Sequence, residues 1–279
     1  MLILPNSSLW YESPIPDLEK LDEAFWLKRS ELVGVNINEK KGLELLEIFG
    51  SKYKNEYEAF PMNETSVPYQ YYVSNPMFGS IDAEILYCMI RYFKPLKITE
   101  IGSGYSTRLS AQAILKNQEE DDSYKCELVA IEPYPQTVLK TGFPGLSELV
   151  PKPIQEIPLS TFERLAQNDI LFIDSSHVLR TGGDLQYEYL EILPRLSKGV
   201  IVQIHDIRIP EDYPKYRLKQ NRFYTEQYLL QAFLAFNNAF EVLWPGNYMQ
   251  LKYPDKLDLA FSRHRQFKGG DSFWMRKIM

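Results

Sequence analysis

Long apolar runs and cysteine are scarce in this chain of 279 residues. The longest unbroken apolar runs span only a few residues, far short of the ~20 that cross a bilayer, so we expect no membrane partner. The first residues, MLILPNSSLWYESP, lack the basic residues and the long apolar stretch of a signal peptide. Only two cysteines occur, Cys88 and Cys126, which excludes a disulfide framework and a zinc knuckle. We therefore expect a cytoplasmic protein.

Positive charge is also in short supply, with 31 basic against 37 acidic side chains and a net charge of -6. This balance argues against a nucleic-acid partner, which needs a basic surface. Glycine (14) and proline (18) are too few for a collagenous or disordered chain, while the hydrophobic fraction of 44% is enough for a sizeable core. The length fits one large domain, or one domain with an extension.

Apolar strand-like segments alternate with helical segments after residue 80, which predicts an α/β fold with a mostly parallel sheet. Apolar spacing predicts helices near residues 81–92 and 185–196, the second capped by Thr181-Gly-Gly-Asp184. The strand-like segments are Lys97–Ile101, Glu127–Ile131, Leu149–Ile154, Ile170–Ile173, Val200–Ile204, Phe240–Trp244 and Ser272–Arg276.

The first 79 residues show helical segments and no alternating strand. The helical segments are Asp17–Ser30 and Asn38–Tyr57, separated by irregular stretches that contain proline and asparagine. We therefore expect two parts, a helical extension over residues 1–79 and an α/β domain over residues 80–279.

A glycine-containing turn, Thr99-Glu-Ile-Gly-Ser-Gly-Tyr-Ser-Thr107, follows the first strand and opens a helix. This position is typical of a turn that holds a nucleotide, although a dinucleotide fingerprint would have a third glycine where Thr107 stands. Glu132 ends the next strand, where a carboxylate can accept hydrogen bonds from both ribose hydroxyls. The alternative for Glu132 is a solvated residue at the end of a strand.

Four polar residues end two further strands: Asp174, His177, His205 and Asp206. Carboxylates and imidazoles at one place suit a divalent cation or a proton transfer. Gln203 and His205 interrupt an otherwise apolar strand, and buried polar groups there need partners, which favours a site. Taken singly, Asp174 could instead cap a turn, and His177 could be a loop residue bonded to backbone.

Other site types are excluded by spacing. The sequence contains no G-x-x-x-x-G-K-[ST] phosphate loop, no G-x-S-x-G elbow and no H-E-x-x-H helix. His264, in Ser262-Arg-His-Arg265, has no comparable setting and is expected at the surface. Cys88 lies on the apolar face of its helix and is expected in the core.

At this point the sequence resembles a known family. Glu100-Ile-Gly-Ser-Gly104 followed by Glu132 resembles motifs I and II of the class I S-adenosylmethionine-dependent methyltransferases. DILFIDSSH (169–177) followed by GVIVQIHDI (199–207) resembles the fourth and fifth strands of the branch related to catechol and macrolide-sugar O-methyltransferases. The resemblance covers about residues 80–277. It implies a Rossmann-like, seven-stranded, mostly parallel sheet flanked by helices, with the last strand antiparallel.

The resemblance also implies site residues. S-adenosylmethionine would be bound by Glu132 at the ribose, by Gln155 or Glu156 at the adenine edge, by Asp174, and by the turn residues Glu100, Gly102, Ser103, Gly104, Ser106 and Thr107. Asp174 and His177 would be catalytic, with His177 the general base. Asp174 and Asp206 would bind Mg²⁺.

The sequence departs from the catechol-type pattern at the end of the fifth strand. Those enzymes have an acid followed by Asn, whereas here His205-Asp206 is followed by Ile207. Either His205 enters the site, or one metal ligand is missing and the ion binds more weakly.

The function implied is O-methylation of a small-molecule acceptor such as a sugar, a phenol or a natural-product intermediate. One alternative is an NAD-type Rossmann oxidoreductase, against which Thr107 counts. Another is a methyltransferase-like binding module without catalysis, using surfaces rich in the 19 tyrosines. Glu132, Asp174 and His177 together at strand ends favour a working site over that module.

Two segments have two interpretations each. Arg208–Arg222 carries five basic and two acidic residues and is either a surface loop or a substrate lid, because ligands bind at the carboxyl ends of such strands. The aromatic stretch Phe223–Phe236 suits either the core or an interface of a homo-oligomer.

Overall fold

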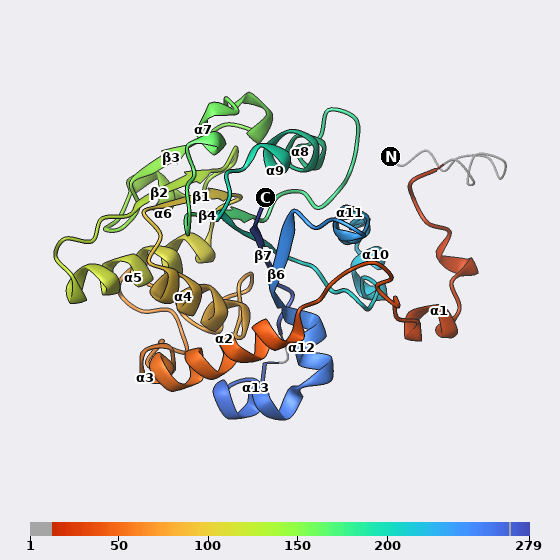
Figure 1. The fold of residues 1–279 in the computed structure, drawn as a ribbon, viewed down its shortest axis with the longest axis horizontal. Helices are drawn as coiled ribbons and strands as arrows, with labels where there is room; N and C mark the ends of the chain where they lie inside the picture. The colour runs from red at the N-terminus through yellow and green to blue at the C-terminus, as the bar shows by residue number, and fades with distance from the viewer. Residues whose placement is uncertain (1–12, 268) are drawn as a thin grey trace.

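Seven strands form a single sheet in the computed structural model, which describes residues 13–267 and 269–279 (Figure 1). The strand order is β3-β2-β1-β4-β5-β7-β6, and β7 is antiparallel to both of its neighbours while the pairs from β3 to β5 are parallel. The predicted Rossmann-like sheet is confirmed, including its antiparallel last strand. The strands are β1 (Lys97–Ile101), β2 (Glu127–Ile131), β3 (Glu148–Val150), β4 (Ile170–Ile173), β5 (Ile201–Ile204), β6 (Phe240–Pro245) and β7 (Phe273–Lys277).

The third strand is shorter than the sequence suggested. It ends at Val150, and Ile154 already belongs to a short 3-10 helix, η3 (Ile154–Glu156). Pro151 and Pro153 stand between the two and cannot donate to a strand ladder, so the predicted extension of this strand to Ile154 is wrong.

The carboxyl ends of four strands lie level with one another. Ile101 at the end of β1 pairs in register with Ile131 of β2 and with Ile173 of β4, and Ile173 pairs with Ile204 of β5. The residues that follow these ends therefore meet at one edge of the sheet. The strand order also reverses between β1 and β4, and ligands bind in such sheets at the crevice this reversal creates.

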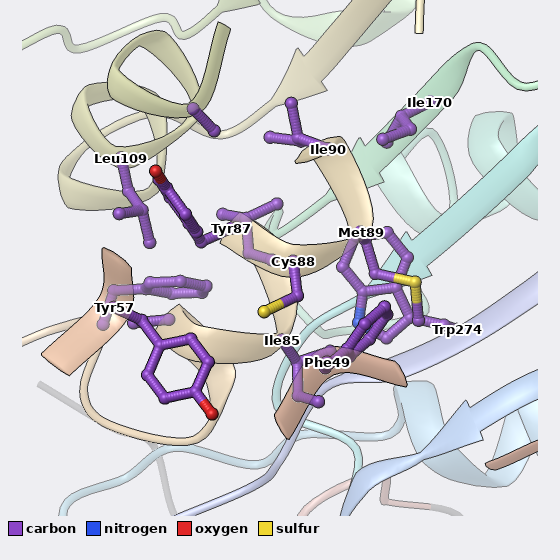
Figure 2. Close-up of a cluster of buried hydrophobic side chains, with 14 of the residues drawn as sticks. Phe49, Tyr57, Ile85, Tyr87, Cys88, Met89, Ile90, Leu109, Ile170 and Trp274 are labelled. Carbon is purple, nitrogen blue, oxygen red and sulfur yellow. The ribbon is translucent and has the colours of Figure 1, made fainter. Parts of the chain in front are cut away.

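One face of the sheet is covered by α4 (Asp82–Phe93), α5 (Tyr105–Glu120) and the short α6 (Thr137–Thr141). The predicted apolar spacing in residues 81–92 is confirmed, because nearly all of α4 is buried. Figure 2 shows Cys88 and Met89 of α4 beside Phe49 and Trp274, and Cys88 is fully buried as expected. Burial of these apolar side chains away from water is the main source of stability on this face.

The opposite face is covered by α11 (Glu226–Leu234), α7 (Ser160–Glu163) and the helical run from α8 (Asp184–Tyr187) to α9 (Leu193–Arg195). A π-helical segment, η4 (Glu188–Ile192), joins α8 to α9. The predicted cap by Thr181 is wrong, because the residue before α8 is Gly183 and no side chain caps it. Asp184 instead accepts hydrogen bonds from the Ser176 amide and hydroxyl.

The N-terminal residues that the structure describes, from residue 13 on, contain helices in both predicted segments, although the segment Asp17–Ser30 holds only a 3-10 turn and one short α-helix. The first twelve residues of the predicted extension lie outside the described residues. The described part holds the 3-10 turn η2 (Leu18–Lys20), α1 (Glu23–Leu27), α2 (Glu39–Lys52) and α3 (Lys54–Glu58). Leu45 and Phe49 of α2 and Tyr57 of α3 belong to the same buried cluster as α4 (Figure 2). The division into residues 1–79 and 80–279 stays a prediction. The described part of the extension shares one buried cluster with the α/β part.

Three helices complete the described part of the chain: α10 (Lys215–Lys219), α12 (Gly246–Lys252) and α13 (Pro254–Ala260). The Tyr57 hydroxyl donates to the carbonyl of Ala260 at 2.8 Å, which ties α3 to the end of α13. Within residues 13–267 and 269–279, no helix combines the length and the apolar character needed to span a membrane.

Candidate active site at the carboxyl edge of the sheet

The glycine turn lies between the ends of β1 and β4. Gly102 adopts a φ of +80°, and a Cβ added there would lie 2.0 Å from the carbonyl oxygen of Asp174. Only glycine fits this conformation and this close approach. The Gly104 amide donates to Oγ1 of Thr107 at 2.9 Å, so Thr107 caps the start of α5 where a dinucleotide fingerprint would have glycine.

Glu132 lies beside this turn. Its Oε2 accepts the Ser103 amide at 3.2 Å and its Oε1 accepts the Tyr134 amide at 2.8 Å. Each carboxylate oxygen keeps a further acceptor position, and the residue is half-buried rather than covered. The carboxylate is thus held in place at the end of β2, with capacity to accept two hydroxyl donors.

Glu100 lies under the turn and is completely buried. Its Oε1 accepts a hydrogen bond from the Ser106 hydroxyl, but Oε2 has no partner among the described residues, and neither has the buried Ser103 hydroxyl. Burial raises the pKa of Glu100 to about 8, against the lowering effect of the Ser106 and Thr107 hydroxyls. Unpaired buried polar atoms at such a turn are what a site for a polar ligand would leave.

Gln155 and Glu156 lie in η3, past the end of β3. Both are exposed, and the Gln155 amide donates to the carbonyl of Gly182 at 3.1 Å. Gln155 therefore joins η3 to the loop before α8 rather than projecting from the strand end.

Asp174, His177, His205 and Asp206 converge, as the sequence predicts. His177 Nε2 lies 3.2 Å from Asp174 Oδ1 and 3.5 Å from Asp206 Oδ2. His205 Nδ1 lies 3.4 Å from the same Asp174 Oδ1. Asp174, His177 and Asp206 offer ligand atoms that all lie within 4.8 Å of one another, which is a spacing for a metal ion.

Two of these residues have left-handed backbone, with φ of 60° at His177 and 57° at Asp206. Such conformations are costly for residues other than glycine and persist when the surroundings fix them. The His177 carbonyl accepts the backbone amides of Thr225 (2.8 Å) and Glu226 (3.2 Å) at the start of α11. This holds His177 against an element far along the chain.

The electrostatics of the cluster couple its members. Burial lowers the pKa of His177 and of His205, but the carboxylate of Asp174 outweighs this for both rings, aided by Glu226 at His177 and Asp82 at His205, so both values lie well above the usual range. Burial raises the pKa of Asp174, yet the two imidazoles bring it below its usual range. In the ion-free protein both rings thus favour the charged form at neutral pH.

A family model described as "Methyltransferase domain" matches residues 99–207, which run from β1 past the end of β5. A protein of Archaeoglobus fulgidus, itself described as uncharacterized, is 34% identical over 167 residues, which is 57% of this chain and 73% of that protein. The chain belongs to the class I S-adenosylmethionine-dependent methyltransferases.

Solved structures at lower identity also resemble this methyltransferase. An O-methyltransferase from Bacillus cereus in complex with SAH is 15% identical, with a TM-score of 0.40 and coverage of 85% of this chain and 91% of that one. A structure described as cmcI-D160 Mg-SAM is 13% identical, with a TM-score of 0.40 and coverage of 81% and 84%. At this distance neither adds an argument about function.

The loop Arg208–Arg222 packs on the site of this methyltransferase and contains α10. Arg217 Nη2 lies 2.5 Å from Asp206 Oδ1 and 3.6 Å from Asp271 Oδ2, and its guanidinium lies over the Tyr224 ring. The Tyr224 ring in turn lies 4.6 Å from that of His177. The loop is therefore tied to the site through Arg217, and its movement as a lid stays a prediction.

Two residues of the site were not identified from the sequence: Glu226 and Asp82. Glu226 Oε2 contacts His177 Nδ1 at 2.8 Å, and Asp82 Oδ2 contacts His205 Nε2 at 3.4 Å. The only signal was a charged residue at the start of an otherwise apolar helix, which is common. His264 was wrongly expected at the surface, since it is 4% exposed and its Nδ1 pairs with Asp258 Oδ1 at 2.6 Å.

Proposed function

We propose that this methyltransferase transfers the methyl group of S-adenosylmethionine to an oxygen of a small-molecule acceptor. One observation carries the proposal: the Asp174–His177 pair lies directly against the glycine turn, because the Asp174 carbonyl fills the space where Gly102 has no side chain. A methyl donor bound at the turn would therefore lie next to a group able to accept a proton.

The cofactor fits the residues that surround the turn. Gly102, Ser103 and Gly104 leave the backbone open to the methionine moiety, and Ser106 and Thr107 fix the start of α5. Glu132 would accept the two ribose hydroxyls. We assign the adenine contact to Gln155, whose exposed side chain would have to turn from Gly182 toward the ligand.

The protein needs to contribute little covalent catalysis, because the sulfonium of the cofactor already activates the methyl group for transfer. The enzyme must align the acceptor oxygen with the methyl group and remove one proton. His177 Nε2 faces the site and Nδ1 is held by Glu226, so the ring is oriented to take the acceptor's proton once the ring itself is in its neutral form. A divalent cation held by Asp174 and Asp206 would lower the pKa of the acceptor hydroxyl.

The alternatives are less well supported. Thr107 stands where an NAD-binding turn would have glycine, and it is used as a cap there. A binding module without catalysis would not need His177 in a strained backbone conformation beside two carboxylates. The acceptor stays a small molecule of unspecified class, and a homo-oligomer stays a prediction.

Calorimetric titration with S-adenosylmethionine and S-adenosylhomocysteine tests the cofactor assignment. We expect micromolar binding that Glu132→Ala weakens at least tenfold, because two charge-assisted hydrogen bonds are lost. Glu127→Ala is the matched control, since Glu127 is exposed at the opposite end of the same strand. Unchanged affinity in Glu132→Ala would place the ribose elsewhere, and no binding to either nucleoside would remove the assignment.

A further inference from the structure

A cavity of about 190 Å³ lies between the N-terminal segment and the loop that packs on the site. One side is lined by residues before and within α1, among them Phe25 and Trp26. The other side is lined by the loop Arg208–Arg222 and the segment that follows it. Lys215 of α10 binds Glu23 of α1 at 3.0 Å, which joins the two sides (Figure 1). The cavity is therefore formed by two segments far apart in the sequence.

Aromatic rings form much of the cavity wall, from Phe25, Trp26, Tyr213, Phe223, Tyr224 and Tyr228. The Tyr213 ring meets those of Tyr224 and Tyr228 edge to face, with centroids 5.5 Å and 6.0 Å apart. An apolar cavity of about 150 Å³ holds one benzene ring, so this volume fits one ring with a small substituent. Aromatic rings prefer edge-on and offset contacts with one another, which favours an aryl group over a saturated group of the same size.

Several polar groups of the wall already have partners within the protein. The Tyr213 hydroxyl accepts the Gln227 amide at 3.1 Å, and the Tyr228 hydroxyl donates to Asp212. The indole N–H of Trp26 differs, because it is buried and has no hydrogen-bond partner among the described residues. A buried donor without a partner is costly, and an acceptor atom on a ligand would remove this cost. The cavity thus suits a ring that carries an acceptor atom such as oxygen.

The charges around the cavity favour a neutral ligand over a cationic one. Asp212 lines the cavity, but its Oδ1 already accepts the Tyr213 amide at 2.7 Å and the Tyr228 hydroxyl. The Nζ of Lys215 lies 6.0 Å from the centre of the Trp26 ring. An ammonium group would meet this lysine and the indole N–H, which is itself a donor. The wall therefore differs from the aromatic cages that bind quaternary ammonium ions.

Tyr224 connects the cavity to the site. It lines the cavity, and its ring centroid lies 4.6 Å from that of His177. Thr225 also lines the cavity and donates its amide to the His177 carbonyl at 2.8 Å. Asp174, His177 and Asp206 are not among the residues that line it. A hydroxyl attached directly to a ring in the cavity would therefore stay away from His177 Nε2, whereas a hydroxyl on an arm of the ring would reach it.

We propose that this cavity binds a neutral aryl group of the acceptor, and that the hydroxyl to be methylated stands on an arm of a few bonds from the ring. Trp26 donates to an acceptor atom on the ring, and the arm runs along Tyr224 to His177. The acceptor is then an aryl alcohol rather than a simple phenol. Binding of the ring supplies affinity from a part of the acceptor that does not react. The inference rests on the proposed function for the role of this ligand as acceptor.

Nuclear magnetic resonance of the cofactor-free full chain, with an isotope label on the tryptophan indoles, tests the cavity. The chain has four tryptophans, and the Trp26 signal is the one that Trp26→Phe removes. We expect anisole to shift this signal with a dissociation constant of about 1 mM or lower, as suits a ligand of this size. Cyclohexyl methyl ether and phenyltrimethylammonium should each bind at least about threefold more weakly. This comparison of ligands needs no variant.

A variant that fills the cavity gives a second readout. Leu218 lines the cavity, so Leu218→Phe should weaken anisole binding at least about tenfold. Leu190→Phe is the matched control, because Leu190 is exposed in η4 and does not line the cavity, and it should bind anisole as the wild type does. An unmoved Trp26 signal, equal binding of the saturated ether or of the ammonium ion, or unchanged binding in Leu218→Phe would each overturn the proposal.

A series of para-methoxyphenyl alkanols of increasing arm length tests whether the ring belongs to the acceptor. The chain has three histidines, and His177→Gln identifies the His177 signal. At least one member of the series should shift the Trp26 and His177 signals together, and the His177 signal by more than anisole does. A series in which no member moves the His177 signal beyond the effect of anisole would overturn the assignment to the acceptor.

These measurements use no cofactor, so they are separate from the titration with S-adenosylmethionine. Failure of that titration would remove the proposed function and leave the anisole shifts in place. Failure of the shifts, with cofactor binding intact, would remove only the aryl site.

Discussion

Glu100→Gln tests the electrostatics under the glycine turn. Glu100 is 0% exposed, and burial raises its pKa from 4.5 to about 8. Between pH 4.5 and about pH 8 the Glu100 carboxyl keeps its proton in the folded protein, whereas the unfolded chain has released it. The free energy of unfolding must therefore fall as the pH rises through this interval, and the loss is complete above about pH 8.

The magnitude follows from the shift. The difference between 8 and 4.5 is 3.5 pKa units. At about 1.4 kcal/mol per unit this amounts to at most about 5 kcal/mol of stability lost between the two values. Glutamine keeps the shape and can accept the Ser106 hydrogen bond, but it does not titrate. We expect Glu100→Gln to exceed the wild type in stability at high pH by a few kcal/mol and to lose most of this advantage near pH 5.

The assay is urea unfolding of the cofactor-free protein at about pH 5, 7 and 9, with the stability difference between variant and wild type as the readout. Other titrating groups cancel in this difference. Glu127→Gln, at an exposed position of β2, is the matched control for replacing Glu by Gln. A difference that is constant across the range, or one that turns in favour of the wild type as the pH rises, would refute the reasoning.

Two further variants test the packing of the site. Gly102→Ala should lower the free energy of unfolding by about 2 kcal/mol or more and abolish cofactor binding, because its Cβ would meet the Asp174 carbonyl at 2.0 Å and its φ is +80°. Gly104→Ala, whose Cβ would have its nearest neighbour 3.9 Å away, is the control for stability alone, and an equal loss of stability in the two variants would contradict the structure. Arg217→Ala should cost about 2–4 kcal/mol in urea unfolding by leaving Asp206 without its guanidinium, and a cost below about 0.5 kcal/mol would mean that the ion pair does not form in solution.

Much of the fold could be predicted because buried parallel strands are apolar runs between turn residues. Lys97–Ile101, Glu127–Ile131 and Ile170–Ile173 were predicted with their observed bounds. The third strand was predicted too long because its prolines were not taken as a stop. The π-helical segment η4 has no local signal, since it inserts one extra residue into a pattern that remains helical.

The sequence predicted only those site residues that directly follow the ends of adjacent strands. Asp174, His177, His205 and Asp206 follow adjacent strands, so their convergence follows from the register of β4 and β5. Glu226 and Asp82 reach the two imidazoles from α11 and from the start of α4. Their sequence separations from the histidines are 49 and 123 residues, and nothing local encodes contacts of that range.

Transfer of a labelled methyl group from S-adenosylmethionine to a panel of sugars, phenols and hydroxy acids tests the central claim most directly. We predict label on oxygen with at least one acceptor, and in Asp174→Ala a loss of turnover of about 100-fold or more with cofactor affinity nearly unchanged, because Asp174 serves the acceptor side. Label recovered only on nitrogen, carbon or sulfur, or an equal loss of turnover and cofactor affinity in Asp174→Ala, would contradict the account.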